Sequence, residues 1–138
     1  MNQINNIVIE GNLTDDPRLV SAKEGGVRLV KLDIANHRSW KDQNGVFQEE
    51  VLFMPVQTWG TLALQCEKNL RKGMGCRIMG RLRMSRWKTK EGEDKYRVEI
   101  VANYVEYYSK RNPDRQIKLC VPEEEERSIS EPSVYYEF

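Results

Sequence analysis

Residues 58–87 read TWGTLALQCEKNLRKGMGCRIMGRLRMSRW, and the spacing of their apolar residues changes within this stretch. A helix is predicted over Thr58–Leu70, because four apolar residues recur at the spacing of one helix face: Trp59, Leu62, Ala63 and Cys66. Thr58 is a residue type that caps helix N-termini. Gly73 and Gly75 then end the helix.

A strand is predicted from Cys76 to Trp87, because side chains of different character alternate there with a period of two. The side expected to face the core carries Cys76, Ile78, Gly80, Leu82 and Met84. The opposite side carries Arg77, Arg81, Arg83 and Trp87. The strand is therefore apolar on one side and strongly basic on the other.

Four further strands are predicted outward from this stretch, over Ile4–Glu10, Val27–His37, Phe47–Gln57 and Tyr96–Tyr108. Asn44-Gly45 is a hairpin signal between the second and third of these. Pro55 donates no ladder hydrogen bond and therefore indicates an edge or a bulge. In the last strand the expected core side carries Val98, Ile100, Ala102 and Tyr104.

The resulting order is three strands, one helix and two strands. This order fits an all-β protein with one helix, folded as a five-stranded OB-fold barrel. The chain of 138 residues suits one folded domain, predicted over residues 1–108. Periodicity ends at Ser109, so residues 109–138 are expected to form a flexible, disordered acidic tail.

Charge is unevenly distributed along the chain although the formal net charge is only +1. Nine basic residues and no acidic residue lie between Lys68 and Lys90, which projects a local positive field. Cys66, Cys76 and Cys120 are an odd number of widely spaced cysteines, as expected of buried thiols in a reducing cytoplasm. No apolar run approaches the length of a membrane span.

Aromatic residues accompany the basic ones, and this combination suits a single-stranded nucleic acid, whose bases stack on rings while its phosphates meet cations. Trp40 and Trp87 lie among charged residues next to polar turns, where packing alone seldom places a tryptophan. Phe53 and Trp59 fit a stacking role and a core role equally well. The phosphate-binding candidates are Lys41, Arg71, Lys72, Arg81, Arg83, Arg86 and Lys88.

Residues 4–108 resemble the bacterial single-stranded DNA-binding protein family. The matching motifs, in order, are Ile9-Glu10-Gly11-Asn12-Leu13, Asp16-Pro17, Ser39-Trp40-Lys41-Asp42, Leu70-Arg71-Lys72-Gly73, Gly80-Arg81-Leu82-Arg83, Arg86-Trp87 and Asp94-Lys95-Tyr96. The resemblance implies four base-stacking positions, at Trp40, Phe53, Trp59 and Trp87. It also implies a homotetramer in the cytoplasm, associated with the nucleoid, that protects single strands during replication, recombination and repair.

Two departures from the family pattern concern protein contacts. Members often have histidine near a subunit interface where this chain has Met54, so the interface is expected to stay apolar. The family tail usually ends in consecutive acids and Pro-Phe, whereas this chain ends in Tyr136-Glu137-Phe138. Glu137 and Phe138 are the candidates for binding replication and repair proteins. The alternative is a frayed terminus without a partner.

No catalytic constellation is found, and an enzyme is not expected. His37 is the only histidine, so no histidine-based triad or metal cluster can be assembled. No cofactor and no metal is expected. Two other classes stay open, an OB-fold RNA-binding module and a primosomal accessory protein whose barrel mainly contacts other proteins.

Overall fold

The computed structural model describes residues 1–22, 26–108 and 118–122. Its elements are β1 (Ile7–Leu13), β2 (Arg18–Ser21), β3 (Leu29–Lys41), β4 (Phe47–Trp59), α1 (Gly60–Asn69), β5 (Gly75–Lys88), β6 (Asp94–Tyr108) and β7 (Lys118–Cys120). The predicted order of three barrel strands, a helix and two barrel strands is confirmed by β1, β3, β4, α1, β5 and β6.

The sheet closes into a five-stranded barrel because β1 pairs with both β5 and β3. Neighbours follow the order β1-β5-β6-β4-β3, and β4 and β6 meet in a short parallel ladder at Val56 and Gln57. Closure needs a small residue at Gly11, where a Cβ atom would lie 2.5 Å from the Ala35 carbonyl oxygen. The OB-fold prediction is thus confirmed.

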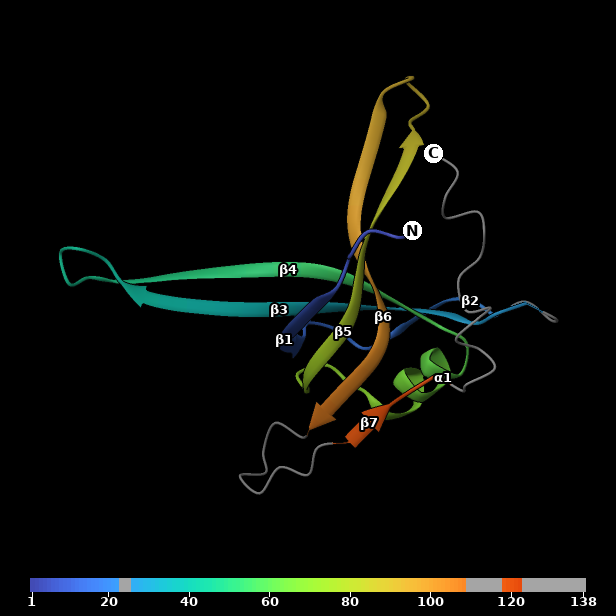
Figure 1. Ribbon diagram of the computed structural model, residues 1–138, viewed down its shortest axis with the longest axis horizontal. Helices are drawn as coiled ribbons and strands as arrows, with labels where there is room; N and C mark the ends of the chain where they lie inside the picture. Colours follow the sequence, from blue (N-terminus) through green and yellow to red (C-terminus); the bar gives the residue numbers. More distant parts are fainter. Residues whose placement is uncertain (23–25, 109–117, 123–138) are drawn as a thin grey trace.

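Two long hairpins extend from the barrel in different directions (Figure 1). The hairpin of β3 and β4 is paired from Leu29–Trp59 to Lys41–Phe47, and that of β5 and β6 reaches Lys88–Asp94. Only the barrel part of each strand is buried. Leu82 and Met84 therefore depart from the core positions predicted for them, since each is 38% exposed on the projecting part of β5.

The core side of β6 changes at a bulge. Met79 pairs with Tyr104 but Gly80 pairs with Ala102, so Asn103 is an extra residue in β6. The extra residue moves the following side chains to the other side, and Val105 becomes fully buried. The core position predicted for Tyr104 is therefore wrong.

The helix buries the predicted face, Leu62, Ala63 and Cys66. The N-cap prediction for Thr58 is wrong because β4 continues through Trp59, which occupies the cap position with extended backbone. Thr58 faces the core instead, and its hydroxyl donates to the Val30 carbonyl at 2.7 Å.

A short strand, β7, forms where the sequence suggested only a tail. Cys120 pairs with Val105 of β6 and is fully buried. The Gln65 side chain of α1 then holds Val121 twice, donating to its carbonyl at 3.0 Å and accepting from its N–H at 3.2 Å. These contacts explain why residues 118–122 depart from the expected lack of structure. The three cysteines are free and buried, as predicted.

Candidate nucleic-acid interface

Three of the four candidate rings share one side of the sheet. Core residues of β4 occupy even positions such as Val56, so Phe53 and Trp59 point to the opposite, outer side. Gln57 pairs with Val101 of β6, so the outer side of β4 continues onto the odd-numbered residues of β6. On β5, Arg83 pairs with Glu99, and Trp87 pairs with Lys95 four pairs further along. Because four is an even number, Trp87 lies on the same side as Arg83. We call this side the aromatic face; it consists of Lys31, Phe53, Gln57, Trp59, Arg81, Arg83, Trp87, Arg97 and Glu99.

The rings of the aromatic face differ in exposure. Phe53 is 69% exposed and Trp87 is 45% exposed, while Trp59 is partly buried beside Gln57. A planar ring with an open surface offers each base a stacking partner whatever its identity. The face therefore suits contact with unpaired bases that lie against β4 and β5.

Trp40 lies on the other side of the β3–β4 hairpin. It pairs with Gln48 at an even position of β4, whereas Phe53 pairs with Ala35 on the outer side. The Arg38 guanidinium is stacked on the Trp40 ring, 4.6 Å from its centroid. The structure therefore does not place all four rings on one surface.

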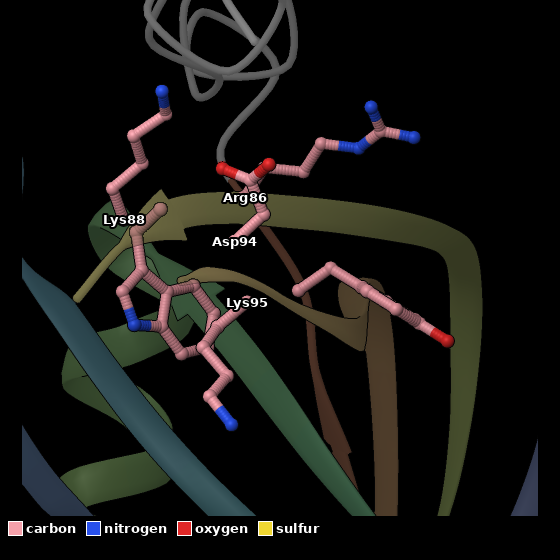
Figure 2. Close-up of a pocket in the computed structure, with 6 residues that line it drawn as sticks. Arg86, Lys88, Asp94 and Lys95 are labelled. Atoms are coloured by element: carbon pink, nitrogen blue, oxygen red, sulfur yellow. The ribbon is translucent and has the colours of Figure 1, made fainter. Parts of the chain in front are cut away.

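A pocket of about 340 Å³ lies at the tip of the β5–β6 hairpin (Figure 2). It is lined by Arg86, Trp87, Lys88, Asp94, Lys95 and Tyr96. Three of these residues are cationic and one, Asp94, is acidic, and Figure 2 shows the Lys88 and Lys95 side chains extending to different sides. The tip thus combines two rings with a local excess of positive charge, which fits a base and its neighbouring phosphates.

The phosphate-binding candidates fall into four places. Arg81 and Arg83 lie on the aromatic face, Arg86 and Lys88 line the tip pocket, and Lys41 ends β3 with its Nζ 4.9 Å from the Phe47 ring centroid. The other two follow α1, on the part of the barrel away from both hairpin tips (Figure 1).

Arg71 and Lys72 have structural contacts there. Nη1 of Arg71 donates to the carbonyl oxygens of Glu67 at 2.8 Å and Leu70 at 2.6 Å, so this side chain caps the helix C-terminus. The backbone N–H of Lys72 donates to Asp16 Oδ1 at 2.9 Å. Neither residue is brought together with the rings.

Arg77 is on the basic side of β5 but is already neutralised. It forms ion pairs with Glu10 at 3.1 Å and Glu106 at 3.2 Å, and the hydrogen bond that Arg77 donates to Glu10 raises the pKa of Arg77. The bulge in β6 and the pairing with β1 place this group on the barrel wall beside Tyr108, away from the hairpins.

Acidic residues of the β3–β4 hairpin are also paired. Glu49 lies 3.5 Å from His37 Nδ1, and Glu50 lies 3.6 Å from Arg38 Nη1. Met54 faces inward and packs against the barrel core, opposite Ile34.

A buried polar network joins the aromatic face and was missed by sequence reasoning. Glu99 is 1% exposed and lies 3.3 Å from Lys31 Nζ and 3.4 Å from Arg97 Nε. Gln57 donates to Glu99 and accepts from Trp59 Nε1 at 3.3 Å. The sequence signal was the alternation of Arg97 and Glu99 with the apolar core residues of β6, which places both on the outer side.

The partner-binding candidates Glu137 and Phe138 lie outside the described residues. Among residues 1–22, 26–108 and 118–122, no cluster of histidine, cysteine or acidic side chains is arranged to hold a metal ion. No helix in this part of the chain is long and apolar enough to cross a membrane.

A closed five-stranded barrel with a helix after its third strand, exposed rings and neighbouring cations defines an OB-fold of the nucleic-acid-binding class. The model of the "Single-strand binding protein family" matches residues 4–108. The chain belongs to this family.

Relatives agree with this assignment. The chain is 37% identical over 111 residues to single-stranded DNA-binding protein 2 of Chlorobaculum tepidum, covering 80% of this chain and 75% of that protein. It is 34% identical over 123 residues to the single-stranded DNA-binding protein of Aquifex aeolicus, covering 89% and 80%.

Two solved structures share the fold. A deletion mutant of the single-stranded DNA-binding protein from Thermus aquaticus superposes with a TM-score of 0.68 at 26% identity over 78% of this chain, which spans only 52% of that one. A Plasmodium falciparum protein in complex with single-stranded DNA superposes with a TM-score of 0.69 over 86% of this chain and 97% of its own, at 18% identity.

Proposed function

We propose that this protein binds and protects single-stranded DNA without sequence preference, by stacking bases on the aromatic face and holding phosphates with its cations. The observation that carries the proposal is the common orientation of Phe53, Trp59 and Trp87 beside Arg81 and Arg83. Stacking on a ring contributes ~1–3 kcal/mol per base and depends little on base identity.

The two hairpins give the DNA an extended path. A strand that follows β4 from Phe53 to Trp59 would cross β6 and reach Trp87 at the tip pocket, where Arg86 and Lys88 can neutralise phosphates. Trp40 would be reached only by a strand that passes around the β3–β4 hairpin. We therefore assign Trp40 to a separate contact from the other three rings.

The proposed role is passive and stoichiometric, in coating exposed strands during replication, recombination and repair in the cytoplasm, associated with the nucleoid. We further propose a homotetramer. Exposed apolar side chains away from the aromatic face, such as Val8, Leu82 and Met84, support contacts between copies. A mass measurement in solution tests the tetramer.

The tail would recruit repair and replication enzymes through Glu137 and Phe138.

Nucleic-acid preference tests the central proposal. Purified protein should retain labelled poly-dT at moderate salt, and unlabelled duplex DNA should compete poorly. Equal competition by duplex and melted DNA would refute the proposal. Stronger competition by poly-U than by poly-dT would favour the RNA-binding alternative, since bases stack in the same way in both nucleic acids.

A further inference from the structure

Glu99 is a buried carboxylate at the centre of the aromatic face. A buried charge is costly unless it is paired and hydrogen-bonded. Glu99 meets this requirement with Lys31 from β3, Gln57 from β4 and Arg97 from its own strand, and Arg83 of β5 lies directly opposite. Four strands therefore converge on one side chain.

The first chain of contacts runs from Glu99 through Gln57 to Trp59. An ionised carboxylate only accepts hydrogen bonds, so it requires the NH₂ group of the Gln57 amide to point toward it. The amide oxygen is thereby turned to the opposite direction, where it accepts the indole N–H of Trp59 at 3.3 Å. Glu99 thus determines which atom of Gln57 meets the ring.

The second chain runs from Glu99 through Arg97 to Trp87. Nε of Arg97 lies 3.4 Å from Glu99, and its guanidinium carbon lies 5.9 Å from the centroid of the Trp87 ring. This distance is within the range of a cation–π contact. The carboxylate therefore holds the cation that lies against the second ring.

We propose that Glu99 is a positioning residue for single-stranded DNA binding, which orients Trp59 through Gln57 and Trp87 through Arg97. Because Glu99 is 1% exposed, it does not contact DNA itself and acts through its neighbours. The inference rests on the proposed role of the aromatic face.

A double-mutant cycle tests the contacts that run from Glu99 through Gln57 to Trp59. Gln57→Leu removes the acceptor for the indole N–H, and Trp59→Phe keeps a ring but removes the N–H itself. Gln57→Leu should weaken oligo-dT binding about three- to tenfold in the otherwise unchanged protein, as expected for one lost hydrogen bond. It should cause no further loss in the Trp59→Phe protein.

Fluorescence tests the role of Glu99 directly. In a protein with Trp40→Phe and Trp87→Phe, Trp59 is the sole tryptophan. Glu99→Gln supplies an amide that can donate as well as accept, so the Gln57 orientation is no longer fixed. The Trp59 emission maximum and its quenching by acrylamide should both change. Thr58→Val is the matched control. It removes a buried hydrogen bond on the core side of β4, the strand that also carries Gln57 and Trp59.

The outcomes separate the two levels of the proposal. Equal losses from Gln57→Leu in both backgrounds, or unchanged Trp59 fluorescence in Glu99→Gln, would overturn the positioning role while leaving the DNA-binding face intact. If Trp59→Ala and Trp87→Ala both left oligo-dT binding unchanged, the face itself would be wrongly assigned and the positioning role would fall with it.

Discussion

The guanidinium of Arg38 lies 4.6 Å from the ring centroid of Trp40, on the side of the β3–β4 hairpin opposite Phe53. The cation is therefore already seated on one surface of this indole. A base that stacks there must either displace Arg38 or use the other ring surface. Trp87 also has a guanidinium nearby, that of Arg97 at 5.9 Å from its ring centroid, but this cation is further from the ring than Arg38 is from Trp40, and Trp87 lines an open pocket.

Removing single rings should weaken DNA binding. Trp40→Ala and Trp87→Ala are each expected to reduce poly-dT affinity by ~1–3 kcal/mol, because each loses a stacking partner for a base. Fluorescence titration at fixed salt measures the loss, and the intrinsic tryptophan emission of the unmodified protein should fall on binding. Losses below about 0.5 kcal/mol for both variants would contradict the stacking mechanism.

The cations can be sorted by the salt dependence of binding. Lys88→Ala should reduce the slope of log affinity against log salt by about 0.7, as expected when one phosphate contact on a single strand is lost. Arg71→Ala should leave the slope unchanged and lower the melting temperature instead, because Arg71 caps α1. The two variants control for each other. A slope reduced equally by both would show that Arg71 also contacts phosphate.

The thiol of Cys76 should make stability depend on pH. Burial raises the pKa of Cys76 from 9.0 to about 12, so the unfolded chain loses this proton first as the pH rises. The contribution of the Cys76 thiol to the free energy of unfolding is complete below pH 9.0. It declines by about 1.4 kcal/mol per pH unit as the pH rises from there toward about 12. Urea unfolding of the protein and of Cys76→Ala, at about pH 8 and about pH 10, isolates this contribution. Identical declines in both proteins would contradict it.

Deletion of residues 131–138 should separate recruitment from DNA binding. The shortened protein is expected to keep its oligo-dT affinity, because the rings and cations of the aromatic face are unchanged. Pull-down of replication and repair enzymes should be abolished, since Phe138 and Glu137 are removed. Partner binding that survives the deletion would end the proposal for the tail.

Much of the fold followed from periodicity alone. The change from helical spacing at Leu62 and Cys66 to alternation after Cys76 located the helix between the third and fourth barrel strands. The bulge at Asn103 did not follow, because an extra residue in one strand is defined only by its partner strand. The true start of α1 was hidden because Thr58 suits both a cap and a buried strand position.

The candidate site was partly predictable. The rings and cations were visible as residue types, and alternation placed Arg81, Arg83 and Trp87 on one side of β5. The connection of Glu99 to Trp59 and Trp87 could not be predicted from the sequence. It depends on which positions of β3, β4, β5 and β6 lie next to one another. The separation of Trp40 from Phe53 likewise required the hairpin register.

The two hairpins meet in one of the shortest ladders of the barrel, with only the pairs Val56–Ile100 and Gln57–Val101. A force that spreads the hairpins would concentrate at this seam, because few backbone hydrogen bonds resist it there. A polymer attached to both Phe53 and Trp87 would bridge the seam from outside. Bound nucleic acid would then resist separation of the two hairpins, and the protein would be mechanically stronger with DNA bound than without it.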